Sequence, residues 1–304
     1  FKHFNNQIVD LDKKFPIEDE INQFSGTELR NRQHCFGYSI EDLELILHPM
    51  AEDAKEATGS MGDDTPLAVL SDKYRPLYHY FRQNFSQVTN PPIDSLRENK
   101  VMSLKTRFGN LGNILNFDNL TEENIYVLES PILSNSQFSK FIKYFGGNYK
   151  FLECTFSKEE NLENALIKLK NEAEKLVREG IKQIILTDKD ISENKLPMPM
   201  LLCIGAINTH LIKLGLRGYV SINVQTGDAL DTHSFATLIG VGATTVNPYL
   251  AFDSLHQRYE KKLFGKLNFD DCVSRYIKSV NLGLLKIMSK MGISVLSSYR
   301  GGCN

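Results

Sequence analysis

Residues 181–188, "IKQIILTD", decide the fold, because this short apolar run has the length and composition of a strand buried on both faces. An amphipathic helix is predicted just before it over residues 158–179, with leucine and alanine on one side and glutamate and lysine on the other, and Gly180 ends it. A largely apolar helix follows, "PMLLCIGAINTHLIKLG" (199–215). A strand between two helices is the repeating unit of a parallel sheet with helical crossovers.

The same alternation of strand and helix fills the second half of the chain. Further strands are predicted at 124–130, 149–156, 219–227, 243–248 and 293–298, and further helices at 231–242, 249–264 and 270–292. Strict succession of the two elements predicts an α/β fold of parallel β/α units with right-handed crossovers. Four or five such units suit either a barrel or an open sheet, and the pattern alone does not choose between them.

The first part of the chain lacks this alternation and is predicted to be an irregular N-terminal extension. Residues 1–33 are interpreted as an extended linker with one short helix near 17–31. Ser39 and Asp42 resemble a capping box at the start of a helix, which Pro49 is expected to end.

The bulk composition argues against several classes of protein. The chain has 304 residues and a formal net charge of -2, so no basic excess marks nucleic acid or an anionic membrane as a partner. Its five cysteines are far apart and form no CxxC motif, which argues against structural zinc and against a disulfide framework. The longest apolar runs are too short to cross a bilayer, and Phe1 does not open a signal peptide. Both ends look cut, which predicts a segment of a longer polypeptide.

Acidic residues follow the predicted strands, at the edge where parallel β/α folds bind ligands. Asp188, Asp190, Asp228 and Asp231 are candidates for catalytic acids or bases, or for caps of the helices that follow them. Capping is the more frequent role of aspartate just before a helix. We therefore expect caps here more often than catalytic groups.

Glycine and histidine residues in the same half favour structural roles. Gly240 and Gly242, in "IGVG", lie where a helix turns into a strand, and the phosphate-binding GxGxxG motif needs the opposite order. His210 and His233 show neither HxH nor HxxxH spacing, so core or surface positions explain them better than metal ligation.

Two segments are rich in glycine, proline and small polar residues: "GSMGDDTP" (59–66) and "QVTNPPID" (87–94). This composition is typical of turns. It is also typical of backbone that must come close to a ligand or form a wall beside one. Composition leaves both interpretations open.

Four long motifs occur together in this sequence. They are "FGYSIEDLELILHPM" (36–50) with the glycine-rich segments after it, "MSLKTRFGNLGNIL" (102–115), "VNPYLAFDSL" (246–255) and "MSKMGISVLSSYRG" (288–301). These motifs closely resemble the large subunit of glutamate synthase, and more narrowly its central domain. The resemblance runs from about Phe36 to the end, with divergent stretches near 119–195.

The resemblance implies an incomplete or rudimentary (β/α)8-barrel-like domain. It implies that residues 1–33 are a linker from a preceding glutaminase domain and that residues 34–304 are the central domain. Within that domain, 34–118 would be tunnel-lining helices and loops, and 119–304 the barrel-like part.

The family's chemistry takes place in the neighbouring domains. A glutaminase domain releases ammonia from L-glutamine, and an FMN-bearing domain with an iron–sulfur cluster joins it to 2-oxoglutarate and reduces the imine to L-glutamate. The resemblance implies no catalytic residue, cofactor or metal site in this segment. It implies those two domains as partners, an NADPH-dependent small subunit or ferredoxin as electron donor, and a location in the cytoplasm or, in a photosynthetic eukaryote, the plastid.

The resemblance also gives the glycine-rich segments a role, because the family places its ammonia tunnel beside them. Ammonia must travel as the neutral molecule, so a suitable wall is narrow, rich in backbone and free of inward-pointing acids. Met61 and Thr89 are the expected gate residues. The expected lining is Gly59, Ser60, Met61, Gly62, Thr89, Asn90 and Pro91. The alternative is an autonomous FMN- or phosphate-binding β/α-barrel oxidoreductase, which flavin retained on purification would favour.

Overall fold

The structure, a computed structural model, describes residues 8–58, 75–82, 90–94, 96–108 and 124–302. Its centre is a four-stranded parallel sheet in the order β4-β6-β8-β9. The strands are β4 (Tyr149–Glu153), β6 (Gln183–Thr187), β8 (Ser221–Gln225) and β9 (Thr245–Asn247). The predicted α/β fold with parallel strands is therefore confirmed.

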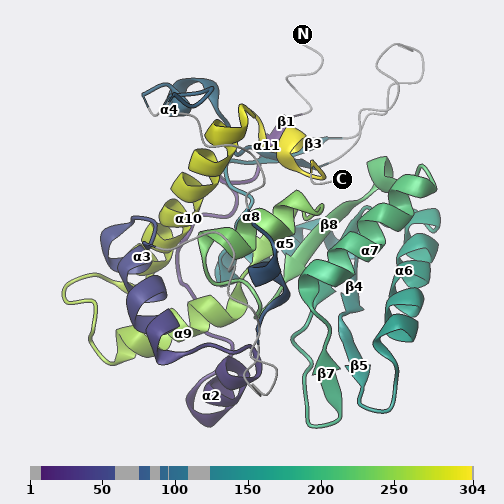
Figure 1. Cartoon of the computed structure of the whole chain (residues 1–304), viewed down its shortest axis with the longest axis horizontal. Coiled ribbons are helices and arrows are strands. Elements are labelled where there is room, and N and C mark those ends of the chain that lie inside the picture. The colour runs from purple at the N-terminus through teal and green to yellow at the C-terminus, as the bar shows by residue number, and fades with distance from the viewer. Residues whose placement is uncertain (1–7, 59–74, 83–89, 95, 109–123, 303–304) are drawn as a thin grey trace.

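Three helices cover one face of this sheet, as Figure 1 shows for α6 and α7 in front of the strands. They are α6 (Leu162–Arg178), α7 (Met200–Lys213) and α8 (Thr232–Gly240). Side chains of Ile184 and Leu186 on β6 join the same apolar cluster as Leu169 on α6 and Ile204 on α7. Burial of this apolar surface is the main term that holds the helices on the sheet.

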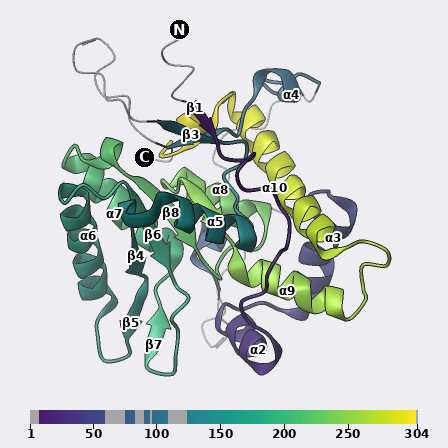
Figure 2. The same ribbon diagram turned by 180° about the vertical axis from the view of Figure 1, so that it is seen from behind.

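The other face of the sheet carries α5 (Asn135–Phe145), which lies in front of β6 and β8 in Figure 2. Ile185 on β6 packs there against Phe138 and Phe141 of the helix and Phe15 from the N-terminal part of the chain. In a closed barrel this face would line the interior. In the described part of this chain, a helix and its apolar cluster fill that space and the four strands form an open sheet.

The same inner face carries a ladder of polar side chains, because residues of neighbouring parallel strands stand side by side. Asn223 Nδ2 donates to Gln183 Oε1 at 2.9 Å, and Thr245 Oγ1 donates to Asn223 Oδ1 at 2.7 Å. Thr187 Oγ1 donates to Gln225 Oε1 at 3.1 Å. We call this set of side chains the amide ladder, and its bonds satisfy polar groups that would be costly to bury alone.

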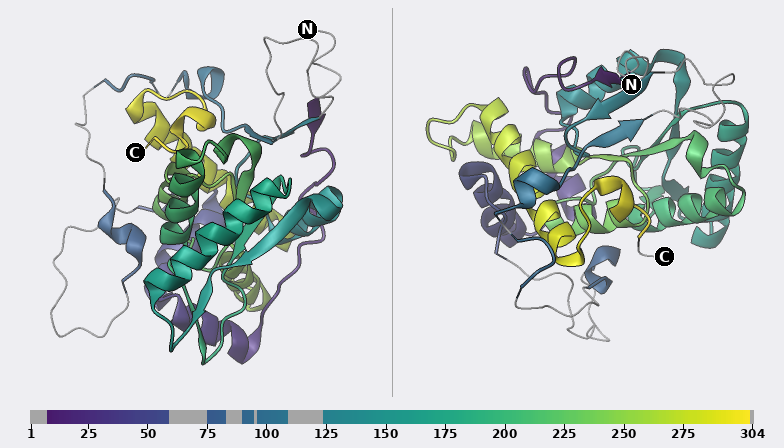
Figure 3. Two further views of the ribbon diagram at one scale, coloured as in Figure 1. Left: turned by 90° about the vertical axis from the view of Figure 1, so that its right-hand side faces the viewer. Right: turned by 90° about the horizontal axis from the view of Figure 1, so that it is seen from above.

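The remaining elements surround this centre. A small mixed sheet has the order β1-β3-β2, and β5 pairs with β7 in an antiparallel hairpin. In Figure 3, left, the molecule is seen from the side on which α6 lies. The bounds are β1 (Ile8–Asp10), α2 (Gly26–Cys35), η1 (Asp42–Leu47), α3 (His48–Asp53), η2 (Leu77–Tyr80), α4 (Glu98–Val101), β2 (Thr106–Phe108), β3 (Ile125–Leu128), η4 (Gly146–Asn148), β5 (Thr155–Ser157), β7 (Lys195–Pro197), η5 (Arg217–Tyr219), α9 (Tyr249–Glu260), α10 (Phe269–Met291) and α11 (Leu296–Tyr299).

The helix predicted to end at Pro49 continues beyond it, so that prediction is wrong. Ser39 and Asp42 do form the expected reciprocal cap, with bonds of 2.8 and 3.0 Å. The π-helical turn η1 follows, and Pro49 then occupies the first turn of α3, where a missing N–H does not break the helix. The helix ends instead at Ala54, which has a left-handed φ of 54°.

Two further boundaries differ from the prediction. The prediction of a strand at 293–298 is wrong, because Val295 forms a single β-bridge to Ser103 and α11 begins at the next residue. Leu296 and Tyr299 are both buried, and a spacing of three residues suits one face of a helical turn. The short helix expected near 17–31 lies instead at Gly26–Cys35.

Candidate functional site at the carboxyl edge of the sheet

The polar residues expected to follow the strands do meet at one edge of the sheet. Asp188 follows β6 and accepts hydrogen bonds from the Thr226 hydroxyl and, at 3.0 Å, from the Gly227 amide, both of which follow β8. Tyr249 follows β9 at the same edge and is fully buried. This edge is where parallel α/β folds hold ligands.

Two carboxyl groups at this edge, those of Asp188 and Asp228, are shielded from water. Burial raises the pKa of Asp188 to about 7, although the hydrogen bonds from Thr226 and Gly227 oppose the shift. Burial also raises the pKa of Asp228 to about 6, and the backbone amide of Met200 opposes that shift. Asp228 Oδ1 has no hydrogen-bond partner among the described residues. Perturbed carboxyl groups in a cleft would be candidates for acid–base chemistry.

The chain's own helix α2 and the residue after it cover this edge. A Cβ placed on Gly227 would lie 2.6 Å from the ring of Phe36, so the ring rests directly on the glycine backbone. Arg32 Nη1 donates to the Lys189 carbonyl at 2.7 Å, and its guanidinium stacks 3.7 Å from the Phe24 ring centre. In the described structure, a side chain therefore stands where a ligand would approach the strand end.

The four aspartates predicted as acids or as caps have different roles. Asp231 caps α8 by accepting from Ser234 N at 2.8 Å, so capping is confirmed for this residue. Asp190 is exposed and pairs with Lys195. Asp188 and Asp228 are buried residues of the edge. Asp228 accepts from the backbone amide of Met200, the first residue of α7, rather than from a helix that follows it in the sequence.

The histidines and glycines behave as structural residues. His233 Nε2 lies 2.8 Å from the Tyr78 carbonyl, and His210 Nε2 lies 2.8 Å from Glu174 Oε2. Gly240 ends α8, and Gly242 turns the chain into β9, as expected. Across the described ranges, no three His, Cys, Asp or Glu side chains are grouped so that they could hold a metal ion.

Most of the predicted tunnel residues lie outside the described residues. This holds for Gly59, Ser60, Met61, Gly62 and Thr89. Asn90 and Pro91 are described, and both are exposed. The adjacent Pro92 lies beside the end of α10, where its Cβ is 3.3 Å from the position of a Cβ on Gly292.

Several residues of the edge escape prediction from the sequence. Arg32 and Phe36 lie in a segment without periodicity, far from the strands that they cover. Asp253 lies inside an amphipathic helix, yet accepts bonds from the backbone amides of Gln23 and Phe24 at 2.9 and 3.0 Å. A buried aspartate on the apolar face of α9 is the one local signal that could have indicated such a contact.

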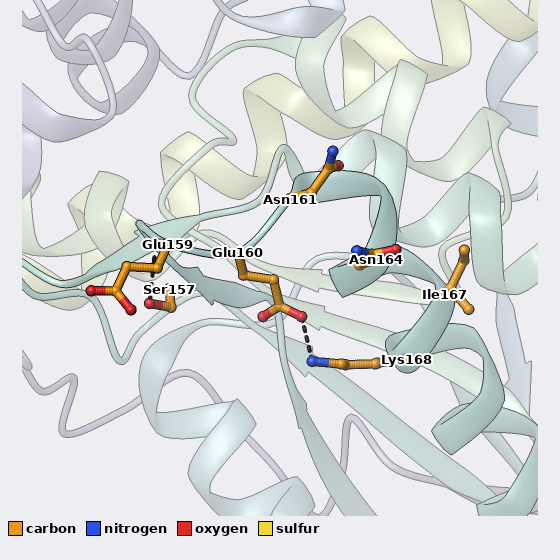
Figure 4. A pocket seen from close by; sticks show the side chains of 7 residues that line it. All are labelled: Ser157, Glu159, Glu160, Asn161, Asn164, Ile167 and Lys168. Carbon is orange, nitrogen blue, oxygen red and sulfur yellow. Dashed lines mark hydrogen bonds and ion pairs between the residues drawn. The ribbon is translucent and has the colours of Figure 1, made fainter.

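A groove also lies on the surface at the start of α6, shown in Figure 4. It has a volume of about 710 Å³ and is lined by Ser157, Glu159, Glu160, Asn161, Asn164, Ile167 and Lys168. Glu160 pairs with Lys168 across it. No histidine or cysteine is among these lining residues.

Comparison with known proteins identifies the family. Residues 31–304 match the family described as the glutamate synthase central domain. The chain belongs to the glutamate synthase family. The resemblance stated from the sequence motifs is thereby confirmed, and glutamate synthase is an oxidoreductase of glutamate and nitrogen metabolism.

Relatives of the glutamate synthase family match nearly the whole chain. The large chain of the NADPH enzyme of Azospirillum brasilense is 53% identical over 98% of this chain, which covers 20% of that protein. The large chain from Bacillus subtilis is 42% identical over 94%, and the chloroplastic ferredoxin-dependent enzyme of Spinacia oleracea is 41% identical over 91%. The chain thus spans about a fifth of the length of the curated relatives that it matches.

Among solved structures, the flavin-binding domain of baker's yeast flavocytochrome b2 is similar to 44% of this chain, with a TM-score of 0.35 and 13% sequence identity, and the match covers 31% of that domain. No helix in the described ranges combines the length and apolar character needed to span a membrane.

Proposed function

We propose that this chain is the central connecting domain of a glutamate synthase, which links the glutaminase and FMN-bearing domains and lines the ammonia tunnel. The observation that supports it best is the match of residues 31–304 to the central domain, together with relatives five times longer than the chain. The whole enzyme would make L-glutamate from L-glutamine and 2-oxoglutarate, with FMN and an iron–sulfur cluster bound outside this segment.

The electron donor and the location follow from the same proposal. The relatives are named as NADPH-dependent and as ferredoxin-dependent enzymes. The partner of the whole enzyme would be an NADPH-dependent small subunit or ferredoxin. The location would be the cytoplasm, or the plastid in a photosynthetic eukaryote.

A connecting role also agrees with the architecture of the sheet. Phe36 and Arg32 occupy the edge where a β/α enzyme would present its ligand, and α5 fills the inner face. We infer that the domain is a reduced relative of a flavin-binding (β/α)8 barrel whose ligand edge has become a packing surface. The division into a linker (1–33), tunnel-lining segments (34–118) and a barrel-like part (119–304) is part of this proposal.

The tunnel proposal assigns Met61 and Thr89 to the gate, supported by Gly59, Ser60, Gly62, Asn90 and Pro91. A methionine is a flexible apolar plug, and threonine offers an oriented dipole without charge. A wall of this kind would keep water away from neutral ammonia, since a site closed to water prevents proton leakage.

The gate is tested in the full-length enzyme by the variants Met61→Ala and Thr89→Ala. We expect the ratio of glutamine consumed to 2-oxoglutarate consumed to rise by roughly twofold or more, because an open gate no longer couples the two reactions. Met291→Ala, at a side chain that is 37% exposed, is the matched control and should leave the ratio unchanged.

An unchanged ratio in both gate variants would exclude the tunnel role of these residues. Flavin that copurifies in stoichiometric amount with residues 1–304 would instead support the autonomous barrel enzyme.

A further inference from the structure

The N-terminal part of the chain crosses the whole molecule as a strap, defined here as residues 11–36. Figure 2 shows it as the purple chain that runs from β1 at the top, beside α5, to α2 at the bottom. Along this path its backbone is held by side chains of α5: Gln137 Nε2 donates to the Phe15 carbonyl at 2.9 Å, and Asn135 Nδ2 donates to the Ile21 carbonyl at 3.1 Å. The strap ends on the carboxyl edge of the sheet.

Asp253 on α9 binds two neighbouring backbone amides of the strap. Its Oδ1 accepts from Gln23 N at 2.9 Å and from Asn135 Nδ2 at 3.3 Å, and its Oδ2 accepts from Phe24 N at 3.0 Å. Both oxygens are therefore acceptors for buried donors. Only a carboxylate offers two acceptor oxygens in this shape, since an asparagine would turn an amide N–H₂ towards one of the donors.

A separate row of amides leads from Gln225 of the amide ladder through Asn247 and Asn135 to Asp253. Gln225 Nε2 donates to Asn247 Oδ1 at 3.3 Å, and Asn247 Nδ2 donates to Asn135 Oδ1 at 3.1 Å. Asn135 then donates to Asp253. Each amide gives its donor towards the carboxylate, which terminates the chain of bonds, and such connected networks are stronger than their separate bonds.

The strap supplies donors to an edge that is rich in acceptors. Arg32 is buried against Lys189 and Phe24, and Gln33 Nε2 donates to Ser254 Oγ at 2.8 Å, one residue after Asp253. Phe36 seals Gly227 beside Asp188. The strap and the edge are thus complementary in hydrogen bonding and in shape.

We propose that Asp253 is the latch of this strap, and that the strap lifts from the carboxyl edge as one unit when the latch is lost, which uncovers Asp188, Thr226 and Gly227. The latch is a positioning residue, because it acts through the strap and touches no reacting group. The proposal does not depend on the enzyme activity proposed above, and its test uses no substrate.

The latch is tested by hydrogen–deuterium exchange of the full chain with Asp253→Asn and Asp253→Ala. We expect backbone amides of residues 11–36 to exchange about tenfold to a hundredfold faster in Asp253→Asn, which loses one hydrogen bond to the carboxylate, and at least as much faster in Asp253→Ala, which loses both. Amides of β6 and α7 should keep their exchange rates. Asp231→Asn is the matched control, since a single oxygen of Asp231 accepts from Ser234 N and asparagine caps equally well.

Two results would overturn the latch. One is wild-type exchange throughout the strap in both Asp253 variants. The other is a rise of equal size in β6 and α7, which would make Asp253 a general core residue. If the variants do not fold, exchange of the wild-type chain at increasing urea concentrations decides the question. The strap amides should then share one opening free energy below that of the sheet, and an opening shared with β6 contradicts the proposal.

Discussion

Replacing Gly242 with alanine should lower the free energy of unfolding by about 3–5 kcal/mol, because strain and overpacking act at the same position. Gly242 has a φ of 129°, a conformation that side chains rarely adopt. A Cβ there would also lie 2.5 Å from Cγ of Asn208 on α7. Asn208 cannot easily move, since its Oδ1 accepts from Arg217 Nε at 2.7 Å. Urea denaturation of the full chain, followed by circular dichroism, measures the loss.

Gly205→Ala is the matched control for this prediction. Gly205 lies in the middle of α7, its φ is not in the left-handed region, and a Cβ would meet nothing within 4 Å. Alanine is a better helix former than glycine, so this variant should gain about 0.5–1 kcal/mol. A Gly242→Ala variant as stable as the wild type would show that the turn before β9 adapts.

Asp188→Asn should make the free energy of unfolding depend less on pH. The raised pKa of about 7 means that between pH 4 and 7 the folded state binds a proton that the unfolded state has released. Stability conferred by the protonated form is therefore lost as pH rises through this window, by at most about 4 kcal/mol. The amide carries no charge, and its oxygen still accepts from Gly227 N, so the variant should be the more stable protein at pH 8.

The measurement is the free energy of unfolding in urea at pH 5.5 and at pH 8. The wild type should lose more stability between the two values than Asp188→Asn. Asp188→Asn should keep part of the change in unfolding free energy between the two pH values, since burial also raises the pKa of Asp228 and Asp253. Asp190→Asn, at an exposed carboxylate, should match the wild type. If Asp188→Asn and the wild type lose equal amounts of stability between pH 5.5 and pH 8, Asp188 is solvated.

The elements with a strong local period could be predicted from the sequence. The strand within 181–188 and the helix α6 after Asn161 follow from apolar spacing and from end signals a few residues away. The turn at Gly242 follows from the same local logic. These features depend on neighbours in the sequence, so the sequence contains all that decides them.

The arrangement of these elements depends on distant residues and could not be predicted. Phe36 rests on Gly227, which lies far away in the sequence, and the apolar face of α5 gives no sign that it will cover the inner face of the sheet. For the same reason the sequence shows that Asp188 and Asp228 are acidic residues after strands, but it does not show that both are buried. Local context predicts caps or catalytic groups at these positions, and tertiary packing decides between them.

The amide ladder has a consequence for how the sheet assembles. Side chains alternate between the two faces of a strand, so a slip of β8 by one residue would turn Asn223 and Gln225 towards the aliphatic side chains of α6 and α7. It would also place Ile222 and Val224 opposite the polar groups of β6 and β9. Misaligned pairings would thus leave several buried amides without partners at once, and the ladder favours the correct alignment over its nearest alternatives.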